Sequence, residues 1–182
     1  MIIACWIILA GFEIFSASRA KPAAERQSWL GIMAHRVPLL AGCALLVLTN
    51  PLPFLNKDLV PHHGLAQGVA VAACVLGLFI GLWSRWMLGG NWSSAVTFKQ
   101  GHELIKTGPY RFVRHPIYTG ILLMCLGTSI EIGQLRCGLG LAIIFASFWI
   151  KLRQEEALMV RHFPDEYPGY RRRVKALVPF VF

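Results

Sequence analysis

The chain has 182 residues, of which 55% are hydrophobic and only 15% are charged, and its mean hydropathy is +0.54. These values lie outside the range of soluble globular domains and indicate an integral membrane protein. The net charge of +9 is also typical of nucleic-acid-binding proteins. That function class is excluded because the sequence holds no soluble basic module.

Five apolar segments follow one another along the chain, at about residues 1–18, 37–55, 65–88, 117–133 and 137–150. A helix needs roughly 20 apolar residues to cross the hydrocarbon of a bilayer. Only Gln134, Leu135 and Arg136 separate the last two segments, which predicts a tight helical hairpin. The sequence therefore predicts an all-α integral membrane protein with about five transmembrane helices, in a single domain over residues 1–182.

The first segment has a cleaved signal peptide as its alternative interpretation. A signal peptide carries its positive charge before the apolar run, whereas Arg19 and Lys21 come after it. This order favours an uncleaved helix with the N-terminus outside. Glu13 and Glu131 are the acids nearest membrane depth, and their places near segment ends favour a structural role over a functional one.

Positive charge gathers on one side of the predicted bundle. Five crossings place residues 19–36, 85–116 and 151–175 on the same side, and these hold every Lys and Arg except Lys57 and Arg136. The positive-inside rule makes that side cytoplasmic. We therefore expect a cytoplasmic C-terminus, on a basic face that can also attract anionic lipid.

The five cysteines lie in or at the edges of apolar segments, with no Cys-x-x-Cys pair and no neighbouring histidine pair. Small buried hydrophobic residues are the expected role of such cysteines. Neither a disulfide nor a zinc site is predicted.

Residues 108–118 concentrate rings and polar groups directly before the fourth apolar segment. Thr107-Gly108-Pro109 predicts a turn, and Pro116 suits the first turn of the helix that follows. Taken singly, the tyrosines of this stretch could be interfacial aromatics and its arginines could be positive-inside residues. Together they predict a rigid turn that holds a polar cofactor at the membrane surface.

The tail continues the fifth helix out of the bilayer and contains the adjacent acids Glu155 and Glu156. Adjacent residues on a helix point about 100° apart, so at most one of the two carboxylates can face a ligand squarely. The alternative role is a solvated face with helical Glu-to-Arg spacing. A turn and a short helix that carries Tyr167 and Tyr170 are expected to follow.

The order of these motifs resembles the isoprenylcysteine carboxyl methyltransferases and their relatives among the phospholipid methyltransferases. The matching elements are Asn91-Trp92-Ser93; Gly108 and Tyr110; Arg114 to Tyr118; Glu155 and Glu156; and Phe163, Glu166, Tyr167 and Tyr170. Residues 85–182 are therefore expected to form the catalytic core, while 1–84 are less diagnostic.

The resemblance implies S-adenosylmethionine, bound at the cytoplasmic face between the loop before the fourth helix and the C-terminal tail. The expected cofactor-binding residues are His102, Glu103, Leu104, Ile105, Gly108, Pro109, Tyr110, Arg114, His115, Pro116, Ile117, Tyr118 and Glu155. A substrate-binding arginine of the family aligns with Lys151, and Arg153 lies half a turn away as an alternative.

The acceptor is expected to be lipophilic and to enter from the bilayer. A prenylcysteine carboxylate is nucleophilic at neutral pH and needs only a cation to orient it, such as Lys151 or Arg153. A phospholipid amine must first lose a proton, with Glu156 or His115 as the candidate base. The family match favours the carboxylate, as in protein-S-isoprenylcysteine O-methyltransferases.

Two other classes stay open as alternatives to a methyltransferase. One is an NADPH-dependent enzyme similar to the membrane sterol reductases, which have an Arg-His-Pro-like stretch in a related architecture. The other is a non-catalytic membrane scaffold. The paired glutamates of the tail favour the methyltransferase over the reductase.

Overall fold

The computed structural model describes residues 1–17, 23–26, 28–49, 52–61, 63–92, 96–99 and 103–181. The predicted all-α architecture is confirmed. Its α-helices are α1 (Ile2–Ala17), α2 (Trp29–Val47), α3 (Gly64–Leu88), α4 (Pro116–Ile132), α5 (Leu135–His162) and α6 (Tyr167–Arg173). Three 3-10 helices, η1 (Pro53–Asn56), η2 (Gly89–Asn91) and η3 (Gly108–Arg111), lie in the connections.

The five apolar helices follow the five predicted segments, and the chain is an integral membrane protein. Helices α2, α3 and α5 are long and apolar enough to cross a membrane by length and composition, and α1 and α4 are shorter apolar helices. That all five cross the bilayer stays a prediction. The continuation of α5 far past Ile150 agrees with the expected extension of the fifth helix out of the bilayer.

The second helix is the one whose predicted bounds were wrong, by about two turns at each end. It begins at Trp29 because the side chain of Ser28 accepts a hydrogen bond from the backbone N–H of Gly31. The helix carries Pro38 in its interior and ends at Val47, where Leu48 turns to an extended conformation. The cap, and not the edge of the most apolar stretch, sets where this helix begins.

Small residues bring the long helices together in two closely packed pairs. A Cβ on Gly120 of α4 would lie 2.6 Å from the carbonyl oxygen of Gly77 in α3. A Cβ on Gly140 of α5 would lie 2.7 Å from the carbonyl oxygen of Gly42 in α2. Since apolar side chains gain little by leaving lipid for a helix interface, such close backbone packing is a main source of helix association in membranes.

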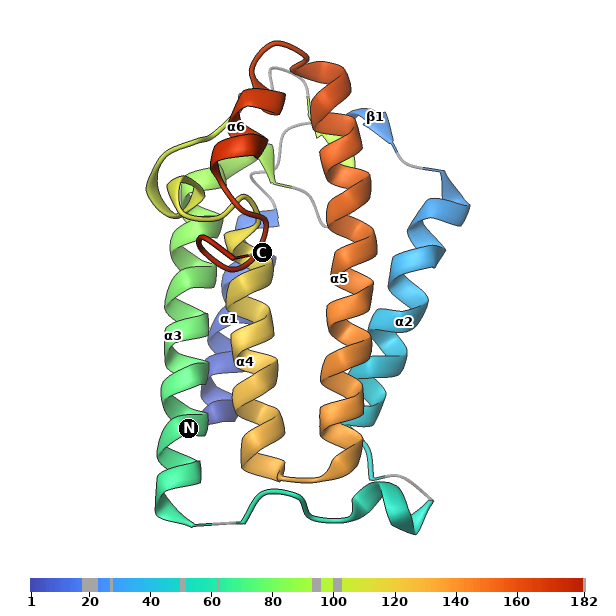
Figure 1. The fold of residues 1–182 in the computed structure, drawn as a ribbon, viewed down its shortest axis with the longest axis vertical. Coiled ribbons are helices and arrows are strands. Elements are labelled where there is room, and N and C mark those ends of the chain that lie inside the picture. Colours follow the sequence, from blue (N-terminus) through green and yellow to red (C-terminus); the bar gives the residue numbers. More distant parts are fainter. Residues whose placement is uncertain are drawn as a thin grey trace.

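At one end of the bundle, two short strands form a ribbon that was not predicted from the sequence. Strands β1 (Ala23–Arg26) and β2 (Thr97–Lys99) pair in antiparallel fashion. The connection after α1 and the connection after α3 therefore lie together, at the end of the molecule where α6 is also found (Figure 1). This common end is the one that the sequence predicts to carry most of the positive charge.

The opposite end contains the tight hairpin between α4 and α5, as predicted. Gly133 turns the chain there with a positive φ of 72°, and its carbonyl accepts hydrogen bonds from the backbone N–H groups of Leu59 and Val60. Asp58 forms a β-bridge with Gln134. The long connection between α2 and α3 is thereby held against the hairpin.

Glu13 and four of the five cysteines have the structural surroundings that were expected, whereas Glu131 and Cys43 are exposed. Glu13 of α1 lies 3.4 Å from Nε of Arg85, a buried arginine of α3. All five cysteines are free, and Cys43 alone among them is exposed on the surface of the bundle. The other four pack as small buried side chains.

Candidate functional site

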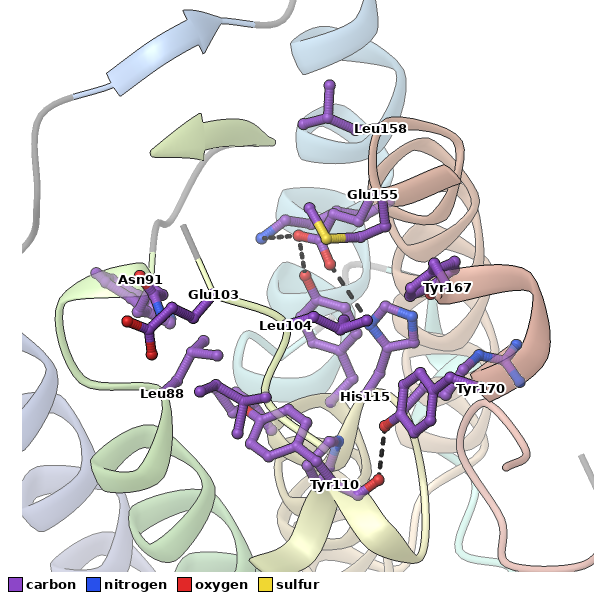
Figure 2. A pocket seen from close by; sticks show the side chains of 18 residues that line it. Leu88, Asn91, Glu103, Leu104, Tyr110, His115, Glu155, Leu158, Tyr167 and Tyr170 are labelled. Carbon is purple, nitrogen blue, oxygen red and sulfur yellow. Dashed lines mark hydrogen bonds and ion pairs between the residues drawn. The ribbon is translucent and has the colours of Figure 1, made fainter. Parts of the chain in front are cut away.

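A pocket opens at the ribbon end of the bundle, between the connection before α4 and the C-terminal part of α5. It encloses about 910 Å³ of empty space, part of which is open to solvent. Its lining residues are Leu88, Asn91, Trp92, Glu103, Leu104, Ile105, Tyr110, Arg114, His115, Pro116, Ile117, Tyr118, Lys151, Glu155, Leu158, Met159, Tyr167 and Tyr170. Figure 2 shows Asn91 and Glu103 on one side of this pocket, with His115, Tyr167 and Tyr170 on the other.

Glu155 is the anion on which several lining side chains converge. The hydroxyl of Tyr118 donates a hydrogen bond of 2.6 Å to Oε1 of Glu155. Nδ1 of His115 lies 3.5 Å from Oε2 of the same carboxylate, and Nζ of Lys151 lies 3.9 Å from Oε1 (Figure 2). The carboxylate is therefore fixed in position by a phenol and two cationic groups.

His115 is the N-cap residue of α4, and the two glutamates beside it favour its protonated form. Burial alone would lower its pKa, but hydrogen bonding and attraction to Glu155 and Glu156 outweigh that effect, and its pKa lies above the ordinary value of 6.5. Its Nε2 lies 3.4 Å from Oε1 of Glu156 and has no hydrogen bond of good geometry among the described residues. Nε2 therefore faces the Glu156 side of the ring, while Nδ1 faces Glu155 and the pocket.

Glu156 forms the wall behind His115 and does not line the pocket. Its Oε1 accepts a charge-assisted hydrogen bond of 2.5 Å from Nη2 of Arg114, and its Oε2 lies 3.2 Å from Nε of Arg171. Arg114 also donates to the backbone carbonyls of Arg171 and Val174. Because this ion cluster joins the segment before α4 to α5 and α6, it holds the pocket's components together.

The tail beyond α6 completes the wall by pairing with the segment before α4. The backbone N–H groups of Arg114 and His115 donate to the carbonyls of Lys175 and Ala176, at 2.8 and 3.0 Å. The hydroxyl of Thr119 donates to the carbonyl of Leu177 at 2.7 Å. The Arg-His-Pro segment is therefore held from both sides, by α5 and by the returning tail.

Tyrosines supply the rings and further donors of the pocket. Tyr170 donates through its hydroxyl to the carbonyl of Tyr110 at 2.6 Å, and Tyr110 donates to the carbonyl of Ser84. Burial is the main cause that raises the pKa of Tyr110, Tyr167 and Tyr170. All three phenols therefore stay neutral and keep their donor protons.

The structure brings most of the predicted site residues together. Ten of the thirteen predicted cofactor residues line the pocket, together with Lys151; these are Glu103, Leu104, Ile105, Tyr110, Arg114, His115, Pro116, Ile117, Tyr118 and Glu155. Gly108 and Pro109 shape the turn below it, where Gly108 has a φ of 59°. Arg153 and Glu156 lie outside the lining, and His102 lies outside the described residues.

Seven lining residues were not in the predicted set. They are Leu88, Asn91, Trp92, Leu158, Met159, Tyr167 and Tyr170. Asn91, Trp92 and the two tyrosines belong to motifs that carried the family resemblance, and that membership was the available signal. Leu158 and Met159 follow Glu155 by about one helical turn, so the helical period places them on nearly the same face.

Comparison with known proteins identifies relatives of most of the pocket region. A family model described as phospholipid methyltransferase matches residues 65–166. The protein-S-isoprenylcysteine O-methyltransferase of Schizosaccharomyces pombe is 30% identical over 118 residues, which cover 63% of this chain and 50% of that protein. The protein of the same name from Saccharomyces cerevisiae is 29% identical over 136 residues, covering 70% of this chain and 57% of that protein.

The human protein-S-isoprenylcysteine O-methyltransferase is 29% identical over 96 residues, covering 51% of this chain and 34% of the human protein. The chain thus spans between about a third and somewhat more than half of the length of these relatives. The matched family model covers more than half of the chain and includes α3, α4 and α5 with the pocket between them. The chain therefore belongs to the phospholipid methyltransferase family.

Proposed function

We propose that this chain transfers a methyl group from S-adenosylmethionine to the C-terminal carboxylate of a prenylated cysteine at the cytoplasmic face of a membrane. The observation that carries the proposal is the fixed carboxylate of Glu155, held by Tyr118 and His115 with Lys151 beside it in one pocket. The printed names of the relatives support the same acceptor.

The chemistry of the lining fits S-adenosylmethionine. Its ammonium and ribose hydroxyls need acceptors, which Glu155 and Glu103 offer. Its carboxylate needs donors, which the side chains of Asn91 and Trp92 in the lining offer. The tyrosine rings and the side chains of Leu158 and Met159 offer an apolar surface to the adenine and a cation–π contact to a positive sulfur.

When bound, the cofactor supplies an electrophilic methyl group on a positively charged sulfur. The protein's contribution is alignment of the two reactants and exclusion of water, which competes as a nucleophile. Lys151 lines the pocket beside Tyr118, with Nζ 5.2 Å from the centre of the Tyr118 ring. From there its ammonium would hold an acceptor carboxylate in line with the methyl group.

A phospholipid amine is the second candidate acceptor, and the description of the matched family favours it. An amine would require a base at the pocket. Glu156 is engaged by Arg114 and Arg171 outside the lining, and the raised pKa of His115 favours its protonated form, which cannot accept a proton. These placements favour the carboxylate, which needs no base.

Two measurements on the full chain in detergent test the proposal. Calorimetric titration with S-adenosylhomocysteine should show binding that Glu155→Gln weakens roughly 10- to 100-fold, since a hydrogen bond to a charged group contributes about 1.5–3 kcal/mol. Glu166→Gln is the matched control, because Glu166 is exposed and pairs with Lys106 away from the lining. Heat with NADPH instead would favour a reductase, and heat with neither ligand a scaffold.

Transfer of radiolabelled methyl from S-adenosylmethionine then identifies the acceptor. A farnesylated cysteine analogue should gain label as an alkali-labile methyl ester, and Lys151→Met should raise the KM for that analogue. Label found only in phosphatidylethanolamine, as an alkali-stable N-methyl group, would establish the second candidate in place of the first.

A further inference from the structure

A second pocket lies on the far side of the wall formed by Arg114 and Glu156. It is lined by Arg114, Trp149, Leu152, Arg153, Glu156, Arg171, Lys175, Ala176 and Val181, and encloses about 610 Å³ of empty space including space open to solvent. Arg114 is the one residue that lines both pockets. The second pocket is therefore a separate site, formed by α5, α6 and the returning tail.

The charge of this pocket is unbalanced. Its lining contains four cations and one carboxylate, Glu156, which already contacts Arg114 and Arg171 and lies 3.4 Å from His115. Among the described residues, neither Arg153 nor Lys175 has a carboxylate within ion-pair distance. Arg153 lies instead over the ring of Trp149, 5.9 Å from its centre. The pocket thus keeps positive charge that an anionic ligand would neutralise.

The rim of the pocket is apolar on the side toward the membrane. Trp149 and Leu152 lie where the predicted apolar stretch of α5 ends, which is the depth of lipid headgroups. The tail beside them exposes large apolar side chains: Phe180 is 90% exposed and Val181, which lines the pocket, is 74% exposed. Apolar groups left open to solvent beside a basic cavity match a ligand that is charged at one end and apolar at the other.

We propose that this pocket binds the headgroup of an anionic phospholipid. Arg153, Arg171 and Lys175 would hold its phosphate, since guanidinium groups bind phosphate through paired hydrogen bonds. Its acyl chains would lie along Trp149 and the apolar tail. Basic pockets between helices on the cytoplasmic side are typical binding places for anionic headgroups. The lipid bound here is not the methyl acceptor, because Arg114 and Glu156 separate it from Lys151 and Glu155.

The test uses native mass spectrometry of the full chain released from detergent micelles. Equimolar phosphatidylglycerol and phosphatidylcholine with identical acyl chains are the probes, with inorganic phosphate in a separate arm. Wild-type protein should retain phosphatidylglycerol in preference to phosphatidylcholine. The double variant Arg153→Gln/Lys175→Gln should lower its affinity for phosphatidylglycerol roughly tenfold, as juxtamembrane cations each contribute measurably to anionic lipid binding.

Arg172→Gln/Arg173→Gln is the matched control, because both arginines are exposed on α6, lie outside the pocket lining, and carry the same total charge. It should change the affinity by less than about twofold, and the charge-conserving variant Arg153→Lys/Lys175→Arg should keep the lipid. Equal losses in both double variants, no preference for phosphatidylglycerol, or displacement of the lipid by inorganic phosphate would each overturn the proposal. Binding of S-adenosylhomocysteine is titrated separately, so that failure of the lipid site is distinguished from failure of the methyltransferase assignment.

Discussion

At the scale of single residues, the charge of His115 depends on two carboxylates from one helix. Glu155 and Glu156 contact different nitrogens of its ring, at 3.5 and 3.4 Å, even though adjacent residues on a helix point about 100° apart. The imidazole ring lies between the directions in which the two glutamate side chains point, and so it contacts both carboxylates. Protonated His115 thereby links the pocket side of α5 to the Arg114 wall.

This contact makes part of the protein's stability depend on pH. Because the pKa of His115 is raised in the folded protein, its contribution is fully present below the unfolded value of about 6.5 and is lost as pH rises through the folded pKa. We expect the difference in thermal unfolding midpoint between wild type and His115→Gln to be largest at pH 6 and to shrink toward pH 9. A difference that grows with pH would contradict a protonated His115.

The residues that face the ligand could be predicted from the sequence. The residues that hold those side chains in position mostly could not. Glu155, Tyr118 and His115 lie in recognisable motifs, and the helical period limited Glu155 and Glu156 to one ligand-facing carboxylate. The partners of Glu156 were not predictable, because Arg171 reaches it only after the tail has folded back. That return depends on backbone hydrogen bonds to segment 114–115, which side-chain patterns do not encode.

At the scale of elements, α2 and α5 approach each other through glycine. Gly42 and Gly140 face each other at their closest point, and Ile144 fills the space beside them. The same helix α5 also carries Gly138, at which an added Cβ would meet nothing within 4 Å. One helix thus offers a packed glycine and an open one, separated by a single residue.

Gly140→Ala should destabilise the protein by about 1–3 kcal/mol, because its Cβ would lie 2.7 Å from the carbonyl oxygen of Gly42 and neither backbone can move freely. Gly138→Ala is the matched control and should be neutral or stabilising by up to about 1 kcal/mol, since alanine favours the helix. Unfolding of both variants in the same detergent measures the effect. Equal midpoints for the two variants would show that the helices do not pack through Gly140.

The approximate positions of the helices could be predicted from the apolar segments of the sequence. The exact helix boundaries and the β1–β2 ribbon could not. The third and fourth helices begin and end close to the predicted residues because proline and glycine mark their ends: Pro116 starts α4, and Gly89 and Gly133 end α3 and α4. The second helix begins at a serine cap well before its apolar core. Strand β1 has the sequence Ala-Ala-Glu-Arg, which lacks β-branched and aromatic residues.

At the scale of the whole molecule, the β1–β2 ribbon and α6 lie at one end, and the α4–α5 hairpin lies at the other (Figure 1). Residues of α5 and α6 and of the segment before α4 line both pockets. Lys57 and Arg136, the two cations outside the predicted basic side, belong to the hairpin end, where Leu135 donates to the carbonyl of Lys57. The geometry of the fold therefore separates charge in the way that the sequence predicts. Which end faces the cytoplasm follows from the positive-inside rule alone.

Labelling of single cysteines tests this orientation. In a Cys43→Ser background, Lys57→Cys should react with a membrane-impermeant maleimide in intact cells, because it is exposed at the end predicted to lie outside. Arg173→Cys, exposed on α6, should react only after the membrane is permeabilised. The reverse pattern of labelling would place the pockets outside the cytoplasm.

The returning tail, which pairs in parallel with the segment before α4 and closes the wall behind His115, has a consequence for biosynthesis. Domains acquire structure from the N-terminus as the ribosome extends the chain. The packed pairs α3–α4 and α2–α5 can form as soon as α5 has been inserted, but segment 114–115 gains its backbone partners only when Lys175 and Ala176 have emerged. A nascent chain can thus reach its full membrane architecture before its pocket exists, so that membrane insertion precedes any chemistry that the site performs.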